Sequence, residues 1–370
     1  MKLRILQQDL LPAVQTLSRS VGVKSTLPVL GNILISTENG KLKLAATNLE
    51  IGVIKLVGAK VTEEGDITVP AKTFSELLSS LGGVELSLET SNDLLTISAG
   101  KFSSKINSIP AAEFPVIPVS SDQAISFERP VIKDYSRIMF AASGDGGRPV
   151  LTGILTAIHQ GKLDLVATDG FRLAHRQINL PNEKSSFKTL IPRRTLEEVL
   201  RIIDEELPAE SEEKISISTS ANQNQIIFMV GLTTISSRLI EGTFPAWEKI
   251  IPSSHTTRVI IDQAILAQAI KLASVFAKNE ANIVSFDISK ERFLITSETK
   301  ELGAQTNELD CQFEGSDIKI AFSARFLSDA ISAIDSKSLT LEFTTPLAPA
   351  LIKPVALEGL EYIVMPVRQS

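Results

Sequence analysis

The sequence predicts an α+β protein built from three copies of one domain, each with two helices and several antiparallel strands. Two observations carry this prediction: a helix signature recurs at a nearly constant interval, and the stretches between helices alternate apolar and polar residues. Alternation with a period of two is typical of strands that bury one face, and Gly, Asn and Ser between them supply turns. Helices mixed with antiparallel strands indicate the α+β class. Stretches of the strand type include 41–46, 94–98, 214–218, 225–230 and 338–343.

The clearest repeat is a short apolar run that leads into a helix, at 67–74, 189–196 and 320–327. Each following segment carries apolar residues at i, i+3, i+4 and i+7, which lie on one face of a helix. The first residues of these faces are Phe74, Leu196 and Leu327, so successive copies are 122 and 131 residues apart. The pattern predicts one amphipathic helix at the same place in each copy.

Other motifs recur with similar offsets, which argues against chance. Residues 27–34 match 148–155, 46–49 match 167–170, and 112–115 match 242–245. A second helix opens each copy, although the middle one is the weakest. Self-similarity at such a period indicates repeated domains. We therefore predict domains at 1–122, 123–252 and 253–370, with helices at 10–24, 71–82, 129–143, 193–203, 263–278 and 324–334.

Composition predicts a cytoplasmic protein. The 370 residues are 43% hydrophobic and 22% charged, which is usual for soluble globular chains. Cys311 is the single cysteine and cannot form an intrachain disulfide, as expected in a reducing compartment. No apolar run approaches the roughly 20 residues that span a bilayer, and polar residues interrupt the N-terminus where a signal peptide would be apolar.

The charges are unevenly distributed between the predicted helices and the rest of the chain. The predicted helices hold 12 basic and 5 acidic residues, a net +7, whereas the whole chain is −6 and the remainder therefore −13. Lys72, Arg194 and Arg325 also occupy the same place in the repeat. We interpret this as a helix-lined surface that faces a polyanion, with acidic charge outside. The alternative is that these are ordinary solvated helix faces.

No motif requires catalysis. The glycine-rich stretch 143–148 lacks the Gly-Lys-Ser/Thr ending of a phosphate-binding loop, and Asp-Gly within 168–172 is first of all a turn signal. His159, His175 and His255 are scattered, without the paired spacing of metal ligands. The sequence predicts no catalytic residue, metal or cofactor; the alternative hypothesis is an enzyme with a site within 144–172.

Several strings resemble the bacterial DNA polymerase III beta subunit family, the sliding clamps: 26–34, 46–50, 109–115, 167–174, 241–245 and 362–368. The resemblance covers essentially the whole chain, and the terminal string is the most specific. It implies three DNA-clamp domains per chain and a head-to-tail homodimer, in which helices line a ring around duplex DNA and antiparallel sheets lie outside. The implied function is a non-enzymatic processivity factor of the replicative polymerase, in the cytoplasm and associated with the nucleoid.

The resemblance also implies three sets of functional residues. The DNA-binding set is Lys24, Lys72, Arg137, Arg193, Arg194, Arg201, Lys271, Lys278 and Arg325. A cleft between the second and third domains would take linear motifs of replicative and translesion polymerases, the clamp loader, and mismatch-repair and ligase-type proteins. Its lining would be Leu151, Thr168, Gly170, Phe171, Arg172, Leu173, Pro245, Lys249, Ile250, Ile363, Val364, Met365, Pro366 and Arg368. The dimer interface would contain Lys101, Lys105, Ile106, Phe276, Ala277, Glu298 and Glu301.

This chain departs from the family pattern at several of these places. Members often carry His where Phe171 stands and Arg where Lys249 stands, and many have an aromatic pair at Pro149 and Val150. Lys24 replaces an Arg, a milder change because Lys still contacts phosphate. The sequence leaves open whether this is the housekeeping clamp or a paralogue.

Overall fold

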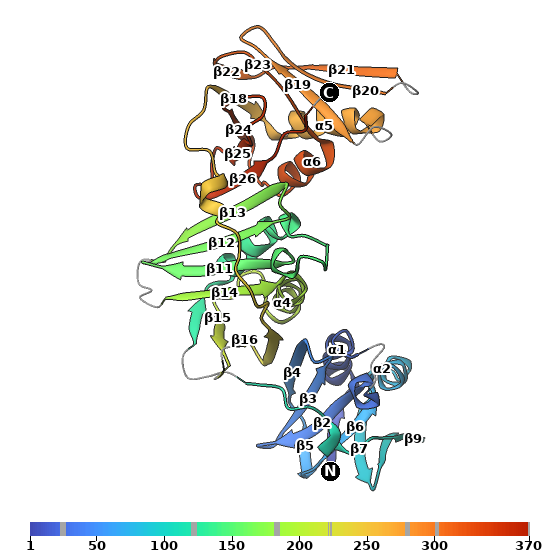
Figure 1. Cartoon of the computed structure of the whole chain (residues 1–370). Helices are drawn as coiled ribbons and strands as arrows, with labels where there is room; N and C mark the ends of the chain where they lie inside the picture. Colours follow the sequence, from blue (N-terminus) through green and yellow to red (C-terminus); the bar gives the residue numbers. More distant parts are fainter. Residues whose placement is uncertain are drawn as a thin grey trace. The chain divides into compact units, whose positions relative to one another are not determined.

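A computed structural model gives the structure of residues 1–22, 27–119, 124–180, 186–220, 222, 224–277, 282–299 and 303–368 (Figure 1). The chain forms two compact units. Unit 1 comprises Met1–Ile132 and Arg194–Leu239, and unit 2 comprises Lys133–Arg193 and Ile240–Ser370. The domain limits at 122 and 252 stay predictions.

The described residues contain six α-helices, one at each predicted place. They are α1 Gln7–Ser18, α2 Ala71–Ser80, α3 Arg129–Lys133, α4 Arg193–Glu206, α5 Gln263–Ala277 and α6 Ala324–Ser332. Each of the three predicted apolar faces points into a core: Phe74 in α2, Leu196 in α4 and Leu327 in α6 are at most 2% exposed. Asp262 caps α5, because its carboxylate accepts the backbone N–H groups of Ala264 and Ile265 at 2.9 and 3.1 Å.

The predicted helix at 129–143 is wrong beyond its first turn. After α3 the chain continues as two 3₁₀ turns, η3 Asp134–Arg137 and η4 Met139–Ala141. Ile132, Tyr135, Ile138 and Ala141 are all buried, at intervals of three residues. An interval of three matches the 3₁₀ helix, which has three residues per turn, and not the α-helix.

The predicted charge excess of the helices is also wrong. Within their observed bounds the helices hold eight basic and eight acidic residues. Arg19 and Arg137 fall outside the α-helices, α4 extends into an acidic end, and Lys24 and Lys278 lie outside the described residues. The basic residues are Lys72, Arg129, Lys133, Arg193, Arg194, Arg201, Lys271 and Arg325; the acidic ones are Asp9, Glu76, Glu197, Glu198, Asp204, Glu205, Glu206 and Asp329.

Unit 1 contains two antiparallel sheets. One has the order β5-β1-β7-β8-β9, with β1 Lys2–Leu6, β5 Lys60–Glu63, β7 Glu85–Ser91, β8 Leu94–Ala99 and β9 Phe102–Asn107. The other has the order β10-β15-β16-β17-β4-β3-β2-β6, with β2 Asn32–Glu38, β3 Lys41–Thr47, β4 Ile51–Val57, β6 Asp66–Pro70, β10 Ile125–Phe127, β15 Ile215–Thr219, β16 Gln225–Val230 and β17 Thr233–Arg238.

Unit 2 also contains two antiparallel sheets. The larger has the order β14-β11-β12-β13-β26-β25-β24-β18-β22, with β11 Gly153–His159, β12 Lys162–Thr168, β13 Arg172–Asn179, β14 Phe187–Pro192, β18 Thr257–Asp262, β22 Gln312–Gly315, β24 Ser338–Phe343, β25 Ala350–Pro354 and β26 Leu360–Val364. The smaller has the order β21-β20-β19-β23, with β19 Ile283–Ile288, β20 Phe293–Thr299, β21 Gly303–Leu309 and β23 Ile318–Ser323.

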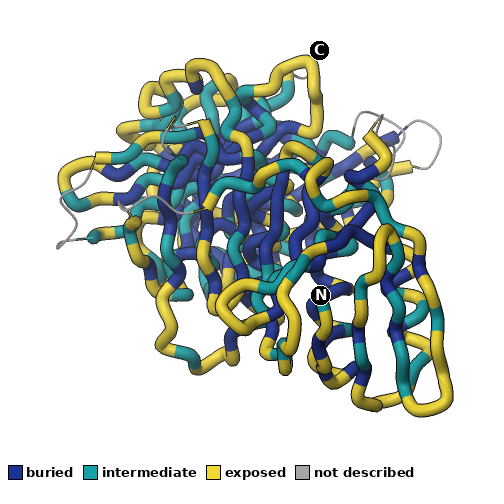
Figure 2. Tube along the Cα trace, turned by 90° about the horizontal axis from the view of Figure 1, so that it is seen from below, coloured by how far each residue is buried: buried dark blue, intermediate teal, exposed yellow. Residues whose placement is uncertain are grey.

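Two strand pairs join successive copies of the sequence repeat. In unit 1, β17 pairs with β4, with Ile235 opposite Val53. In unit 2, β13 pairs with β26, with Leu173 opposite Ile363. Each pair makes one continuous sheet from two copies. Along the chain trace, buried stretches alternate with exposed loops (Figure 2). The helices and antiparallel sheets confirm the predicted class.

None of the helices in the described part of the chain has the length and apolar content of a membrane-spanning segment.

Candidate functional site

A tight turn between β12 and β13 presents an aromatic ring to solvent. Thr168 Oγ1 donates a hydrogen bond to the carbonyl of Arg172 (2.6 Å) and accepts one from the N–H of Gly170 (3.1 Å). Asp169 Oδ1 accepts the N–H groups of Phe171 (2.9 Å) and Arg172 (3.1 Å). Gly170 has φ +93°, a conformation that suits glycine. The turn is thus fixed by its own polar groups, and Phe171 stands 58% exposed at its tip.

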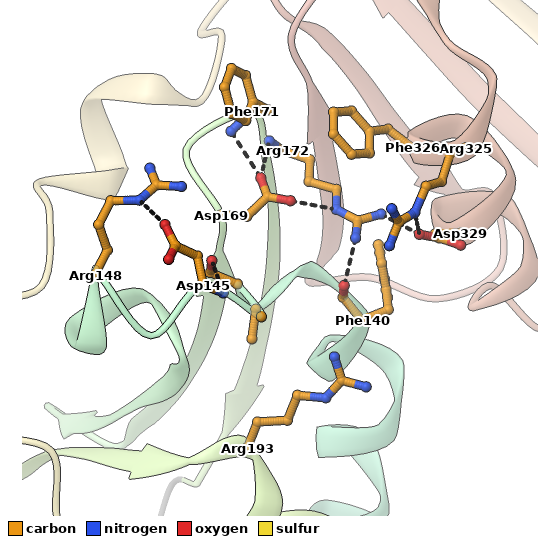
Figure 3. A pocket seen from close by; sticks show the side chains of 13 residues that line it. Phe140, Asp145, Arg148, Asp169, Phe171, Arg172, Arg193, Arg325, Phe326 and Asp329 are labelled. Atoms are coloured by element: carbon orange, nitrogen blue, oxygen red, sulfur yellow. Dashed lines mark hydrogen bonds and ion pairs between the residues drawn. The ribbon is translucent and has the colours of Figure 1, made fainter. Parts of the chain in front are cut away.

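Arg172 is buried behind this turn, and Figure 3 shows its guanidinium among Asp169, Asp329 and Phe140. Nε lies 3.1 Å from Asp169 Oδ2, Nη1 donates to Asp329, and Nη2 donates to the Phe140 carbonyl at 2.8 Å. The guanidinium also lies 4.7 Å from the ring centre of Phe326. The N–H groups of the Arg172 guanidinium are largely occupied by these partners. Arg172 therefore links β13 to α6 and stabilises the turn.

A pocket of about 530 Å³ opens beside this network (Figure 3). Arg148, which pairs with Asp145 at 3.5 Å, lines it, and the Arg325 side chain there is 74% exposed. Three aromatic rings and four arginines belong to the lining, so the pocket presents both apolar and basic surface. Its lining is Phe140, Ala142, Ser143, Gly144, Asp145, Arg148, Asp169, Phe171, Arg172, Arg193, Arg325, Phe326 and Asp329.

An apolar cluster lies on the face of the same sheet that carries Leu173. Its buried members come from six strands and one loop: Leu155, Val166, Leu173, Leu190, Phe244, Leu351 and Ile363. Five partly buried side chains pack against it and lie nearer the surface: Val150, Ile240, Trp247, Ile250 and Ile251. The predicted cleft residues Leu173, Ile250 and Ile363 meet here. The sequence analysis missed Ile240, Trp247 and Ile251, although the family string at 241–245, which contains Phe244, lies next to them in the chain.

The segment after β26 continues this surface. The Met365 N–H donates to the Phe171 carbonyl at 3.0 Å, and the Val367 N–H donates to the Ala321 carbonyl at 2.8 Å. A second pocket, of about 420 Å³, adjoins it. Leu347 there is 66% exposed, and the lining is Lys319, Ile320, Ala321, Pro346, Leu347, Val367 and Arg368. Only Val367 and Arg368 belong to the terminal string that the sequence analysis singled out.

The remaining predicted cleft residues divide by exposure. Leu151 and Val364 are buried, Met365 and Pro366 are half-buried, and Pro245 and Lys249 are exposed. The structure thus brings the predicted set to one region of unit 2, with the Thr168–Arg172 turn and the terminal segment joined by the hydrogen bond at Phe171.

The predicted DNA-binding residues differ in availability. Arg137 pairs with Asp134 at 2.9 Å, and Arg201 pairs with Glu198 and Glu205. Arg193 is half-buried. Lys24 and Lys278 lie outside the described residues. The exposed members are Lys72, Arg194, Lys271 and Arg325.

The predicted interface residues are of two kinds. Ile106 and Ala277 are 6% and 1% exposed and belong to the cores of their own units. Phe276 is half-buried, Lys101, Lys105 and Glu298 are exposed, and Glu301 lies outside the described residues. Helix α5 also exposes Leu272 (47%) and Val275 (54%), apolar residues that the sequence reasoning did not single out. Among the described residues, no group of three His, Cys, Asp or Glu side chains could hold a metal ion.

Comparison with known proteins gives matches along nearly the whole chain. Three family models match in order: the N-terminal domain of the DNA polymerase III beta subunit at residues 1–118, its central domain at 129–246 and its C-terminal domain at 248–368. Beta sliding clamps of Staphylococcus epidermidis and Staphylococcus aureus are 28% identical over 95% of this chain and 94% of their own length.

Solved structures are similar over the full length of both chains. The DNA polymerase sliding clamp of Bacillus subtilis is 26% identical with a TM-score of 0.94. A sliding clamp of Pseudomonas aeruginosa bound to griselimycin is 25% identical with a TM-score of 0.92.

Proposed function

The chain belongs to the DNA polymerase III beta subunit family, and from this premise we propose how its residues perform the role of a sliding clamp. It encircles duplex DNA, holds the replicative polymerase on it, and recruits partners through a peptide-binding surface. The observation that carries this function is the match of all three domain models, in order, along one chain. The three model ranges also support domains at 1–122, 123–252 and 253–370.

Ring closure follows from the order of the strands. Strands β17 and β26 are the last strands of their hairpins and pair with β4 and β13 of the neighbouring copy. By the same repeat, β9 is the equivalent of β17 and β26, and β21 is the equivalent of β4 and β13. Both β9 and β21 are edge strands, and an edge strand offers unpaired backbone groups to another chain. We infer that β9 of one chain pairs with β21 of a second.

This pairing is head-to-tail, because it joins two different surfaces, and the resemblance to the family implies that it closes after two chains. Charge favours it as well. Lys101 and Lys105 are exposed at β9, and Glu298 is exposed on β20 beside β21. Phe276, Leu272 and Val275 of α5 supply apolar surface near the end of that helix.

Contact with DNA is assigned to phosphates and not to bases. Lys72, Arg194 and Arg325 are each the second residue of their helix, α2, α4 and α6, and all three are exposed. A cation at a helix N-terminus is unfavourable to the helix dipole. Its recurrence in three helices therefore supports a role toward an external anion, for which helix N-termini are suited.

The peptide-binding surface combines the apolar cluster, the Thr168–Arg172 turn and the segment from Met365. Apolar side chains would hold the anchors of a linear motif, and polar groups beside the terminal segment would set its direction. A related clamp is bound to griselimycin, which supports a ligand site in this family. We propose that polymerases, the clamp loader, and mismatch-repair and ligase-type proteins use this surface.

The alternative of an enzyme within 144–172 has less support. Asp145 pairs with Arg148, and Asp169 pairs with Arg172. Both carboxylates are therefore engaged in ion pairs within their own turns. We therefore propose that these side chains are structural and that the chain has no catalytic residues of its own.

Replacing Lys72, Arg194 and Arg325 together by Ala should weaken binding to a short linear duplex and flatten its salt dependence. Each lost phosphate contact lowers the slope of log K against log salt by about 0.9, and fluorescence anisotropy at several salt concentrations measures it. The matched control replaces the exposed strand residues Lys41, Lys60 and Lys188 and should retain the slope. Equal effects of the two triple variants, or a footprint at one preferred sequence, would contradict this assignment.

Lys105→Glu with Phe276→Asp should convert the dimer to a monomer in sedimentation velocity. Burying Phe276 contributes on the order of 2 kcal/mol, and the reversed charge would face Glu298. Ile106 is unsuitable for this test because Asp there would disrupt its own core. The control Ile265→Asp, at a residue 47% exposed on the same helix, should remain dimeric. Adding Glu298→Lys to Lys105→Glu should restore affinity; a dimer that survives the double variant would refute the interface.

Deleting Met365–Ser370 should abolish binding of a polymerase-derived clamp peptide and leave the dimer intact. The deletion removes half-buried apolar residues and the backbone bonded to Phe171 and Ala321. Met365→Ala should weaken binding less, since most of the surface remains. Arg172→Ala should also weaken it, but its loss removes the ion pairs of Arg172 with Asp169 and Asp329 and must be checked for stability. The control Val355→Ala, exposed on unit 2, should bind normally. Unchanged affinity of the truncated chain in a fluorescence titration would show that the surface is misassigned.

A further inference from the structure

His175 on β13 is buried between two carboxylates. It is 6% exposed, its Nε2 lies 2.8 Å from Asp164 Oδ1, and its Nδ1 lies 3.4 Å from Glu361 Oε2. An ionised carboxylate only accepts hydrogen bonds, so both ring nitrogens are satisfied together only when each carries a proton. The geometry of the two partners therefore favours the imidazolium form.

The His175 ring lies against Trp247, the single tryptophan of the chain, with the ring centres 4.4 Å apart and the planes tilted by 45°. Trp247 opens the short helix η6, Trp247–Ile250, which carries the candidate peptide-binding residues Lys249 and Ile250. It also packs against the apolar cluster. A cation this close to an indole is attracted to its π-system, so the charge on His175 bears on the position of this turn.

The sheet register places His175 at the border of the apolar cluster. Leu173, two residues earlier on the same strand, lies on the same face and belongs to the cluster. Val166 and Glu361 are the cross-strand partners of His175 on the two neighbouring strands. His175 and its two carboxylates thus lie next to the apolar cluster, and Trp247 contacts both His175 and the cluster.

We propose that His175 is a positioning residue for partner peptides: held as a cation by Asp164 and Glu361, it fixes the indole of Trp247 and the turn that carries Lys249 and Ile250. The wall of the apolar surface is then formed before a peptide arrives. The proposal rests on the peptide-binding surface proposed above. It predicts that partner affinity falls when His175 loses its proton.

The direction of the titration follows from the neighbours of His175. Burial lowers the pKa of His175, but its hydrogen bonds with Asp164 and Glu361 outweigh burial and raise the pKa above the ordinary 6.5. The hydrogen bond from His175 lowers the pKa of Glu361, and it also helps to lower the pKa of Asp164 against the effect of burial. Lys162 on β12 and Lys353 on β25 are the further charged groups that act on these carboxylates.

A histidine whose pKa is raised by folding stabilises the folded state fully below pH 6.5 and loses that contribution as pH rises through the higher folded value. The two carboxylates behave in the opposite way. Because folding lowers their pKa values, their contribution to the stability of the folded state is lost only in more acidic solution. The arrangement is therefore complete at mildly acidic to neutral pH and is lost toward alkaline pH.

The first experiment follows the fluorescence of Trp247 in the full-length protein from mildly acidic to alkaline pH. An imidazolium quenches indole more strongly than neutral imidazole, so emission should rise with a midpoint above 6.5. Glu361→Gln should lower that midpoint, and His175→Gln should abolish the transition. His159→Gln, at an exposed histidine of the same unit, should leave the curve unchanged. Absence of a transition in the unmodified chain, or its persistence in His175→Gln, would overturn the proposal.

The second experiment measures binding of a fluorescein-labelled polymerase clamp peptide by anisotropy over the same pH range. At neutral pH His175→Gln should bind about three- to tenfold more weakly, as expected for the loss of a cation–π contact, and its affinity should vary less with pH. His159→Gln should match the unmodified chain. If His175→Gln proves unstable in thermal unfolding, the shift of the Trp247 fluorescence midpoint in Glu361→Gln tests the proposal in its place.

The two experiments separate the proposal from the function on which it rests. A tryptophan transition with pH-independent peptide affinity would overturn the positioning role and leave the peptide-binding surface intact. A tryptophan transition in a chain that binds no clamp peptide at any pH would overturn the peptide-binding surface, and the positioning role with it.

Discussion

The fold depends on the pairing of sheet edges between successive copies of one repeat. An antiparallel sheet ends in strands with unpaired backbone groups, and each copy satisfies some of them by joining its neighbour: β4 with β17 in unit 1, and β13 with β26 in unit 2. The equivalent strands β21 and β9 are left at sheet edges. We propose that the constraint that builds the chain also sets how a second chain adds to it, so that ring closure repeats the internal joint.

The two internal joints carry different surfaces, although they share a plan. At the first, Gly52 on β4 occupies the place of Leu173, and Ile117 lies so close that a Cβ on Gly52 would meet it at 2.8 Å. Ile117 packs there on a small apolar cluster with Phe114. At the second joint, Trp247 stands where Ile117 does in the repeat and is held from the side by His175. The first joint, where Ile117 packs closely on the sheet, is suited to stability. The second joint, where Trp247 is only partly buried, is suited to binding.

Local patterns could be predicted from the sequence because they need no distant partner. The helical faces that begin at Phe74, Leu196 and Leu327 and the alternating strands were predicted correctly. The prediction for 129–143 failed because Ile132, Tyr135 and Met139 were taken as one face of an α-helix, whereas the buried residues are Ile132, Tyr135 and Ile138. The predicted excess of basic residues in the helices was wrong because the observed helices end at other residues than predicted. Arg19 and Arg137 fall outside the α-helices, and α4 includes the acidic residues at its end. The burial of Arg172 could not be foreseen, since Asp329 is 157 residues away in sequence, and the contact of His175 with Trp247 depends on the same long-range packing.

Retention on circular DNA tests the central claim, a closed ring around the duplex, most directly. The protein would be loaded by its clamp loader onto nicked circular DNA and passed over a sizing column in moderate salt, before and after one cut linearises the circle. A ring held by topology stays with the circle, because leaving requires opening a strand-paired joint, and it slides off the linear product. Equal retention on both forms, or equal loss from both, would contradict the account.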